Sequence, residues 1–232
     1  MAEIPESTNP SIIPFKGIRG SIARNMTAGW KAPRVAIGIE VDMTRCVNLQ
    51  TTLRQTSGTR ARMSITPIVL RAVALALREH PYMNALVREV GVERMHSINI
   101  GLAVSIDDGL VVPVIRDADD KSIIAIADEI GQLALAARAG ELPLKAYQSG
   151  TFTVTSLGAA GVAWFTPILN PPQVGILGLS QVVERPVVRD GRITSARMTT
   201  LTLVFDHRAV DGNPAAEFLN HLKRRLESCE SL

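Results

Sequence analysis

The sequence predicts a mixed α/β fold, and three observations lead to it. Apolar and polar residues alternate in several short runs, which is the two-residue period of a strand with one buried face. In other segments apolar residues recur every three or four positions, as in helices packed on a core. Strands and helices do not alternate strictly, and no Gly-x-Gly-x-x-Gly or phosphate-loop motif is present. A doubly wound parallel sheet is therefore disfavoured, and we expect a mixed sheet covered by helices.

Residues 1–12 show no apolar period and contain two prolines. We expect them to form a flexible lead-in or the stub of a linker, so the ordered domain should span residues 13–232. Apolar spacing and helix stop signals predict the first elements: a helix through Ile18, Ile22 and Met26, a strand over 35–41, a helix over 44–53, and a helix capped at Thr66-Pro67 and stopped by His80-Pro81.

Turn and cap residues mark the ends of the elements expected in the remainder of the chain. Strand-like runs within 98–115 flank Asp107-Asp108-Gly109, which predicts a hairpin, and Pro113 predicts an edge or an irregular position in the second run. Ser122 is a helix cap and Gly140 a helix stop. Further expected elements are strands over 151–155, 173–184 and 198–205, the last two joined across Arg189-Asp190-Gly191-Arg192, a loop over 158–161, and a helix capped by Asn213 and continuing through Leu226.

The composition is that of an ordinary globular protein, with 46% hydrophobic and 20% charged residues in 232. The net charge is +3, but basic residues are dispersed and aromatic residues make up 4%, so nucleic-acid binding is disfavoured. No apolar run approaches the roughly 20 residues of a membrane span, and no signal peptide is evident. Cys46 and Cys229 show neither metal spacing nor a paired framework, which predicts no metal site and a reducing, cytoplasmic setting.

The stretch over 200–212 places an imidazole where a strand runs out into a turn. Apolar residues alternate from Leu201 to Phe205, so His207 is expected to continue the buried face at the strand end. Asp211 follows four residues later, and an imidazole held near a carboxylate is suited to general base catalysis. A lone histidine on an apolar face is more often a satisfied core residue, so spacing alone favours that interpretation.

The string His-Arg-Ala-Val-Asp-Gly over 207–212 resembles the His-x-x-x-Asp-Gly signature of dihydrolipoamide acyltransferases and chloramphenicol acetyltransferase. Blocks over 13–19, 99–104, 108–114 and 150–158 also resemble the catalytic domain of 2-oxo acid dehydrogenase complexes, in the family's order. The resemblance therefore covers most of the chain. It implies a two-layer mixed-sheet α/β domain of the coenzyme A-dependent acyltransferase type, the chloramphenicol acetyltransferase-like fold.

The resemblance implies acyl transfer between dihydrolipoamide and coenzyme A, with His207 as the base for the attacking thiol. It assigns the oxyanion donor to the Thr155 hydroxyl, where most relatives carry Ser, although spacing alone would make Thr155 an ordinary strand residue. Ser156 is the next candidate donor and, like Ser64 before the helix at Thr66-Pro67, a candidate for coenzyme A binding. Asp211 is expected to orient the loop through an arginine, of which Arg208 is the nearest in the chain.

The chain departs from the family's pattern at three positions, which bear on coenzyme A affinity and acyl preference. Gln50 replaces a usual Arg, Ser105 a usual Asp and Arg34 a usual His, and Arg54 is a substitute one turn from Gln50. The resemblance also implies a homotrimer or larger cage with its active site between subunits. The lipoyl group would be carried on another domain or chain, and the partners would be a lipoyl domain, the decarboxylase and dihydrolipoamide dehydrogenase.

Two other functions remain open from the sequence, as does the identity of the acyl group. A free-standing coenzyme A acyltransferase acting on another acceptor would match a chain with neither a lipoyl nor a subunit-binding domain. A catalytically silent assembly scaffold would match the changes at Gln50 and Ser105, but the intact His207, Asp211 and Gly212 favour an enzyme.

Overall fold

The computed structural model describes residues 14–56, 63–107, 109–230 and 232. The lead-in predicted over residues 1–12 lies outside them and stays a prediction. The described residues form a seven-stranded sheet at the centre of the fold. In spatial order its strands are β1 (Arg34–Asp42), β11 (Arg192–Asp206), β9 (Gly175–Leu179), β8 (Phe152–Ser156), β4 (Ile100–Leu102) and β7 (Val114–Ile115), with β10 (Val183–Arg189) paired to β11.

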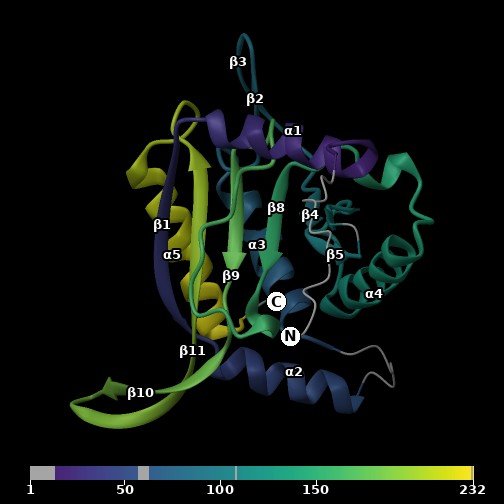
Figure 1. Ribbon diagram of the computed structural model, residues 1–232. Coiled ribbons are helices and arrows are strands. Elements are labelled where there is room, and N and C mark those ends of the chain that lie inside the picture. Colours follow the sequence, from purple (N-terminus) through teal and green to yellow (C-terminus); the bar gives the residue numbers. More distant parts are fainter. Residues whose placement is uncertain (1–13, 57–62, 108, 231) are drawn as a thin grey trace, which may run out of the picture.

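The sheet is mixed, because β8 runs parallel to its neighbours β4 and β9 while the other pairings are antiparallel. The α-helices of the described part of the chain are α1 (Gly17–Lys31), α2 (Thr44–Thr56), α3 (Thr66–Glu79), α4 (Ile123–Ala139) and α5 (Gly212–Ser228). In Figure 1, α3 and α5 lie behind the sheet, α1 crosses its top and α2 lies beneath it. The predicted two-layer mixed α/β fold is confirmed. None of these helices is long and apolar enough to cross a membrane.

The core lies between the sheet and the two helices behind it. Phe218 of α5 packs on Phe152 of β8 with 6.0 Å between ring centroids, and Phe205 of β11 is also fully buried. Burying one such side chain stabilises the fold by about 1.5–3 kcal/mol. The core therefore holds β8 and β11, the strands that carry the candidate catalytic residues, as parts of one rigid body.

From Leu201 to Asp206 the second face of β11 is buried too, so the prediction of one buried face is wrong there. Thr202 and Val204 are buried, although alternation places them opposite the apolar face. Val204 forms a small apolar cluster with Leu169 and Ile176. Leu169 belongs to the long segment that connects β8 to β9 along the chain and runs in front of the sheet (Figure 1). Strand alternation carries no sign of this segment, because it lacks regular structure over most of its length.

Most predicted elements are confirmed. Ser122 caps α4 by accepting a hydrogen bond from the Ala125 N–H at 3.2 Å, and Gly140 ends α4 in the left-handed region at φ 71°. Pro113 precedes β7, which is an edge strand as predicted. The hairpin expected within 98–115 is β5 (Val104–Ile106) paired with β6 (Gly109–Val111). The single strand predicted over 173–184 is wrong, because β9 ends at Leu179 and β10 begins a separate pairing.

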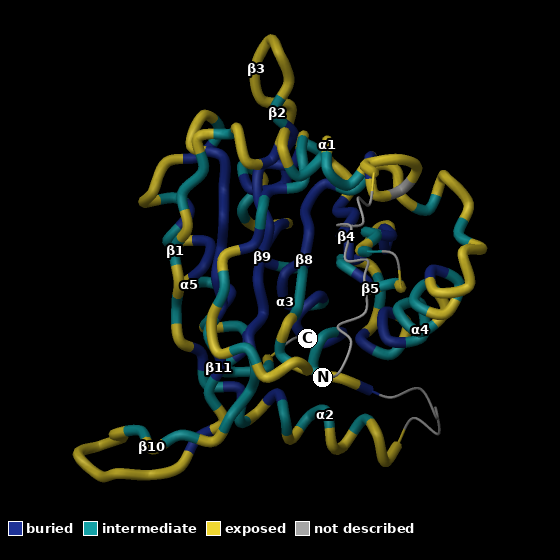
Figure 2. Tube along the Cα trace, viewed as in Figure 1, coloured by how far each residue is buried: buried dark blue, intermediate teal, exposed yellow. Residues whose placement is uncertain are grey.

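Two cap predictions are corrected by the structure. Ile65 rather than Thr66 is the N-cap of α3, and Asp211 rather than Asn213 is the N-cap of α5. A hairpin of β2 (Ala85–Arg88) and β3 (Gly91–Arg94) has no counterpart among the predicted elements, because its strands are too short to show a period. Figure 2 shows that the tips of this hairpin and of the β10–β11 hairpin are exposed arms.

Candidate active site

His207 follows the last residue of β11 and opens the turn into α5. Its backbone N–H donates to the Pro33 carbonyl at 2.9 Å, and its ring centroid lies 5.9 Å from that of Phe205. Its side chain is 45% exposed, so the expectation that it continues the buried face is wrong for the single chain. The strand ends at Asp206, so the imidazole leaves the sheet. The backbone of His207 is fixed, while its ring faces outward.

The turn that carries His207 is held by Asp206, which the sequence analysis does not single out. The Asp206 carboxylate is buried and accepts hydrogen bonds from the Arg208 N–H at 3.0 Å and from Arg208 Nη2 at 2.6 Å. These hydrogen bonds and the Asp206 charge raise the pKa of Arg208. A buried carboxylate needs such a partner. The acidic residue at the last strand position, two before an arginine, is the sequence signal for this pair.

Asp211 stands at the N-terminus of α5, close to the imidazole. Its Oδ1 lies 3.7 Å from His207 Nδ1, which is too long for a hydrogen bond. Arg208 is engaged by Asp206, and no arginine pairs with Asp211 in the part of the chain that the structure describes. Asp211 therefore faces the Nδ1 side of the ring, while His207 Nε2 makes no hydrogen bond to any described residue.

Thr155 and Ser156 end β8 on opposite faces of the sheet, because successive strand residues alternate. Thr155 is half-buried, and its hydroxyl makes no hydrogen bond within the described residues. Ser156 Oγ accepts from the Gly158 N–H at 3.3 Å. Gly158 begins η2 (Gly158–Ala160), a 3-10 turn in place of the predicted loop, and Leu157 is its N-cap. Of the two hydroxyls, only that of Thr155 makes no hydrogen bond to a described residue.

Ser64 is exposed and lies two residues before α3. The carbonyl of its neighbour Met63 accepts hydrogen bonds from Gln50 Nε2 at 2.7 Å and from Arg54 Nε at 2.8 Å. Gln50 and Arg54 both belong to α2. This helix therefore fixes the backbone beside Ser64, and Arg54 places a cation one residue away from it.

The other two departures from the family's pattern lie on different parts of the fold. Ser105 is exposed on β5. Arg34 stacks on Trp30, with its guanidinium carbon 3.4 Å from the ring centroid, and donates to the Trp30 carbonyl at 2.6 Å. Arg34 also lies opposite Asp206 in the register of β1 and β11, at the end of the sheet that carries His207.

The candidate residues fall into two groups at opposite ends of the sheet. Thr155 aligns with Gly178 of β9, which aligns with Thr202 of β11, and His207 lies five residues beyond Thr202. At about 3.4 Å per residue this is roughly 17 Å along the strand, besides two strand spacings across the sheet. In Figure 1 the end of β8 points toward α2, whereas β11 ends at the opposite edge. Ser64, held by α2, belongs to the Thr155 end.

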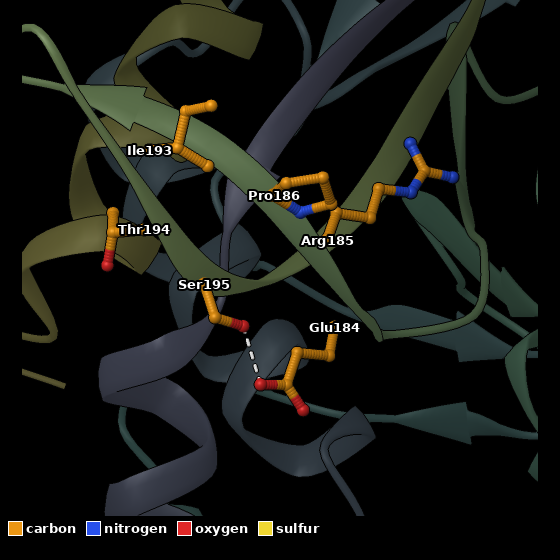
Figure 3. Close-up of a pocket in the computed structure, with 6 residues that line it drawn as sticks. All are labelled: Glu184, Arg185, Pro186, Ile193, Thr194 and Ser195. Carbon is orange, nitrogen blue, oxygen red and sulfur yellow. Dashed lines mark hydrogen bonds between the residues drawn. The ribbon is translucent and has the colours of Figure 1, made fainter.

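The pocket drawn in Figure 3 does not join these groups. It has a volume of about 400 Å³, lies on the β10–β11 hairpin and contains a hydrogen bond from Ser195 Oγ to Glu184 at 2.5 Å. Its lining residues are Glu184, Arg185, Pro186, Ile193, Thr194 and Ser195. Neither His207 nor Thr155 lines it. Within the described ranges no cluster of three His, Cys, Asp or Glu side chains has the geometry to hold a metal ion.

Comparison with solved structures first defines the class of fold. Chloramphenicol acetyltransferase superposes with a TM-score of 0.55 at 16% identity, over 93% of this chain and 99% of that chain. The two proteins share a fold. A probable dihydrolipoamide acetyltransferase from Listeria monocytogenes 4b F2365 superposes with a TM-score of 0.91 at 35% identity, covering 97% of each chain.

Residues 7–232 match the family described as 2-oxoacid dehydrogenases acyltransferase (catalytic domain). The chain belongs to this family, which confirms the resemblance seen in the sequence. The dihydrolipoyllysine-residue acetyltransferase component of the pyruvate dehydrogenase complex of Bacillus subtilis (strain 168) is 38% identical over 228 residues, 97% of this chain and 51% of that protein. The chain therefore spans about half the length of this curated relative.

Two further structures bear on the site and on assembly. The Azotobacter vinelandii dihydrolipoamide acetyltransferase superposes with a TM-score of 0.90 at 32% identity, over 100% of this chain and 99% of that chain. The roles of a serine, a histidine and an asparagine in its catalytic mechanism were studied there, with the histidine 52 residues after the serine and four before the asparagine. A structure with the same TM-score, identity and coverage is the cubic core of a pyruvate dehydrogenase multienzyme complex.

Proposed function

We propose that this chain transfers an acyl group between a dihydrolipoyl thiol and coenzyme A, as the catalytic core of a 2-oxo acid dehydrogenase complex. One observation carries the proposal. Thr155 precedes His207 by 52 residues and His207 precedes Asp211 by four, the intervals that separate the serine, histidine and asparagine of the Azotobacter enzyme. The hydroxyl and the imidazole are kept, and a carboxylate stands in the place of the amide.

His207 acts as the general base for the attacking thiol. Its Nε2 atom is the one that accepts the proton, because Nδ1 faces Asp211 at 3.7 Å. The Asp211 carboxylate favours the proton on the Nδ1 side of the neutral ring and stabilises the imidazolium that forms. Unperturbed thiols and imidazoles differ by about two pKa units, and positioned proton transfer across such a gap contributes roughly 10² to 10⁴ in rate.

Thr155 acts as the donor to the oxyanion that forms when the thiol attacks the acyl carbonyl. Its hydroxyl has no partner among the described residues, so donating to the oxyanion costs no hydrogen bond of the resting enzyme. The end of β8 is rigid, which keeps the donor aimed without reorganisation. The tetrahedral intermediate then collapses by expelling the second thiol, which takes the proton back from His207.

The two reacting groups come from different chains of a homotrimer, which can assemble further into a larger core. About 17 Å along the sheet separates Thr155 from His207 in one chain, far beyond the roughly 3 Å reach of groups that share one reacting carbon. The cubic core found for a relative with the same fold supports this assembly. The partners are a lipoyl domain, on another domain or chain, with the decarboxylase and dihydrolipoamide dehydrogenase. Two free cysteines fit the cytoplasm as the setting.

Coenzyme A binds at the Thr155 end, where Ser64 and Ser156 also lie. Ser64 offers an exposed hydroxyl before the N-terminus of α3, an end that favours anions. Arg54, fixed through Nε to the Met63 carbonyl, supplies a cation in the absence of an arginine at Gln50. Ser156 Oγ accepts the Gly158 N–H, which fixes its position and leaves its O–H free to donate to the ligand.

A thiol-release assay tests the reaction and the acyl class together. Acetyl, propionyl and branched acyl coenzyme A are each offered with dihydrolipoamide to the assembled protein, with the His207→Ala variant as control. We expect transfer from at least one donor at a rate the variant does not reach. A correctly assembled protein that transfers none of these groups would refute the proposed function, and would favour the inactive scaffold or an enzyme for another acceptor.

A further inference from the structure

The two cysteines of the chain, 183 positions apart in sequence, are in contact in the fold. The sulfur of Cys46, in the first turn of α2, lies 2.9 Å from the sulfur of Cys229, the residue that ends α5. Both sulfurs also lie near the Leu226 carbonyl, at 3.0 Å from Cys46 and 3.3 Å from Cys229. In Figure 1 the C-terminal end of α5 approaches α2 at this point. The spacing of the two cysteines in the sequence does not predict this contact.

The two thiols differ in accessibility and acidity. Cys46 is fully buried, and its hydrogen bond to Cys229 together with burial raises its pKa. Cys229 is half-buried, and its hydrogen bond with Cys46, helped by the Arg45 charge, lowers its pKa although burial opposes the shift. The thiolate is the reactive form of cysteine. Cys229 is therefore the thiol that reacts first with an external reagent, and Cys46 is the buried thiol beside it.

The surface beside the pair carries charged side chains of both signs. Arg45 and Ser228, the sequence neighbours of the two cysteines, line a pocket of about 760 Å³ together with Arg224, Arg189, Asp42 and Glu227. Asp42 is paired with Arg189 and Glu227 with Lys223. Neither Arg45 nor Arg224 forms an ion pair with another described residue. The Arg45 and Arg224 guanidinium groups attract the carboxylates of an acidic small molecule to this pocket, whose lining residue Ser228 directly precedes Cys229 in the chain.

We propose that Cys46 and Cys229 are a thiol–disulfide modification site that reacts with small acidic disulfides of the glutathione type. The Cys229 thiolate attacks one sulfur of glutathione disulfide, which forms a mixed disulfide and releases one glutathione thiolate. Cys46 then attacks the Cys229 sulfur and expels the second glutathione, and its proton passes to that leaving thiolate. The two cysteines are oxidised by two electrons, and the small disulfide is reduced to two thiols.

The second step is favoured by proximity. The Cys46 sulfur already touches the Cys229 sulfur, so little of α2 or α5 needs to move for the bond to form. The bond ties α2, the helix that holds the backbone beside Ser64, to the end of α5. It closes a loop of most of the chain, which restricts the unfolded state and raises the thermal midpoint of the oxidised protein.

The test is oxidation of the native protein with glutathione disulfide, followed by thiol titration after denaturation. We expect the two free thiols per chain to fall to none, with no retained glutathione, a monomeric band on a non-reducing denaturing gel, and recovery of both thiols with dithiothreitol. Two thiols that remain free, one glutathione that stays bound, or bonds between chains would each overturn the proposal.

Single variants separate the two roles. In Cys46→Ser, Cys229 should keep one glutathione per chain, because no second thiol resolves the mixed disulfide. In Cys229→Ser, the remaining thiol should stay free, because Cys46 is fully buried. The same adduct level in both variants would contradict the assigned order of attack. The wild-type measurements stand by themselves if a variant does not fold.

Discussion

Replacing Thr155 by Val removes one hydroxyl and little else, so it isolates the proposed oxyanion donor. The hydroxyl makes no hydrogen bond within the described residues, and Val keeps the β-branched shape that suits a strand. Beside Thr155 in the register lies Gly178, which has no side chain to repack. We therefore expect the free energy of unfolding to change by less than about 1 kcal/mol.

The rate constant should fall much further. Losing one oxyanion donor costs roughly 10² at the lower end, which is about 2.7 kcal/mol of the activation barrier. Because the donor acts mainly in the transition state, Michaelis constants should change only a few-fold. Steady-state kinetics of Thr155→Val with one thiol pair, after sedimentation confirms assembly, makes the measurement, and Thr155→Ser is the matched control that should stay active. Normal turnover of the Val variant would refute the assignment and make Ser156 the next candidate.

The other predictions concern the base, its supporting turn and pH. His207→Ala should lower turnover by at least about 10² without changing sedimentation, because a general base contributes that much and the ring is exposed; wild-type activity would exclude His207 as the base. Asp206→Ala should lower the free energy of unfolding, measured in urea, by about 1–3 kcal/mol, because Arg208 loses a buried partner. An unchanged unfolding midpoint would show that the Asp206–Arg208 pair does not stabilise the fold. Burial, and then the charge of His221, lower the pKa of His80, so the folded state favours its neutral form. The stability that the neutral His80 contributes is fully present above a pH of about 6.5, the ordinary pKa of histidine. It is lost as the pH falls toward the lowered pKa of His80 in the folded state. The free energy of unfolding of His80→Gln, measured in urea, should therefore fall less between pH 7.5 and 5.5 than that of the wild type. An equal fall in both proteins would contradict the assignment of this pH dependence to His80.

Local signals in the sequence predict the elements that depend on them. The cap at Ser122, the stop at Gly140 and the edge position after Pro113 follow from the backbone chemistry of single residues, although the predicted caps at Thr66 and Asn213 miss the observed ones by one and two residues. Apolar spacing places the helices and most of the strands for the same reason. The order of the strands is not contained in these signals, because parallel pairing of β8 with β4 and β9 joins segments far apart in the chain.

The exposure of His207 and the contact of the cysteines are decided by tertiary structure. Alternation predicts a buried His207, but the strand stops at Asp206 when that carboxylate pairs with Arg208. The partnership of Cys46 and Cys229 depends on how α2 meets the end of α5, which no short spacing encodes. The residues of the site follow from a motif in the sequence, whereas their separation to opposite ends of the sheet appears only with strand order.

Co-expression of two inactive variants tests most directly whether the site is shared between chains. His207→Ala keeps the hydroxyl and Thr155→Val keeps the base, so a mixed trimer contains sites with both groups intact. In a random one-to-one mixture about one quarter of the sites should be complete, while each variant alone should show about 1% of wild-type activity or less. The shared site predicts recovery to about one quarter of the wild-type rate. Activity that stays at the level of the separate variants would contradict it.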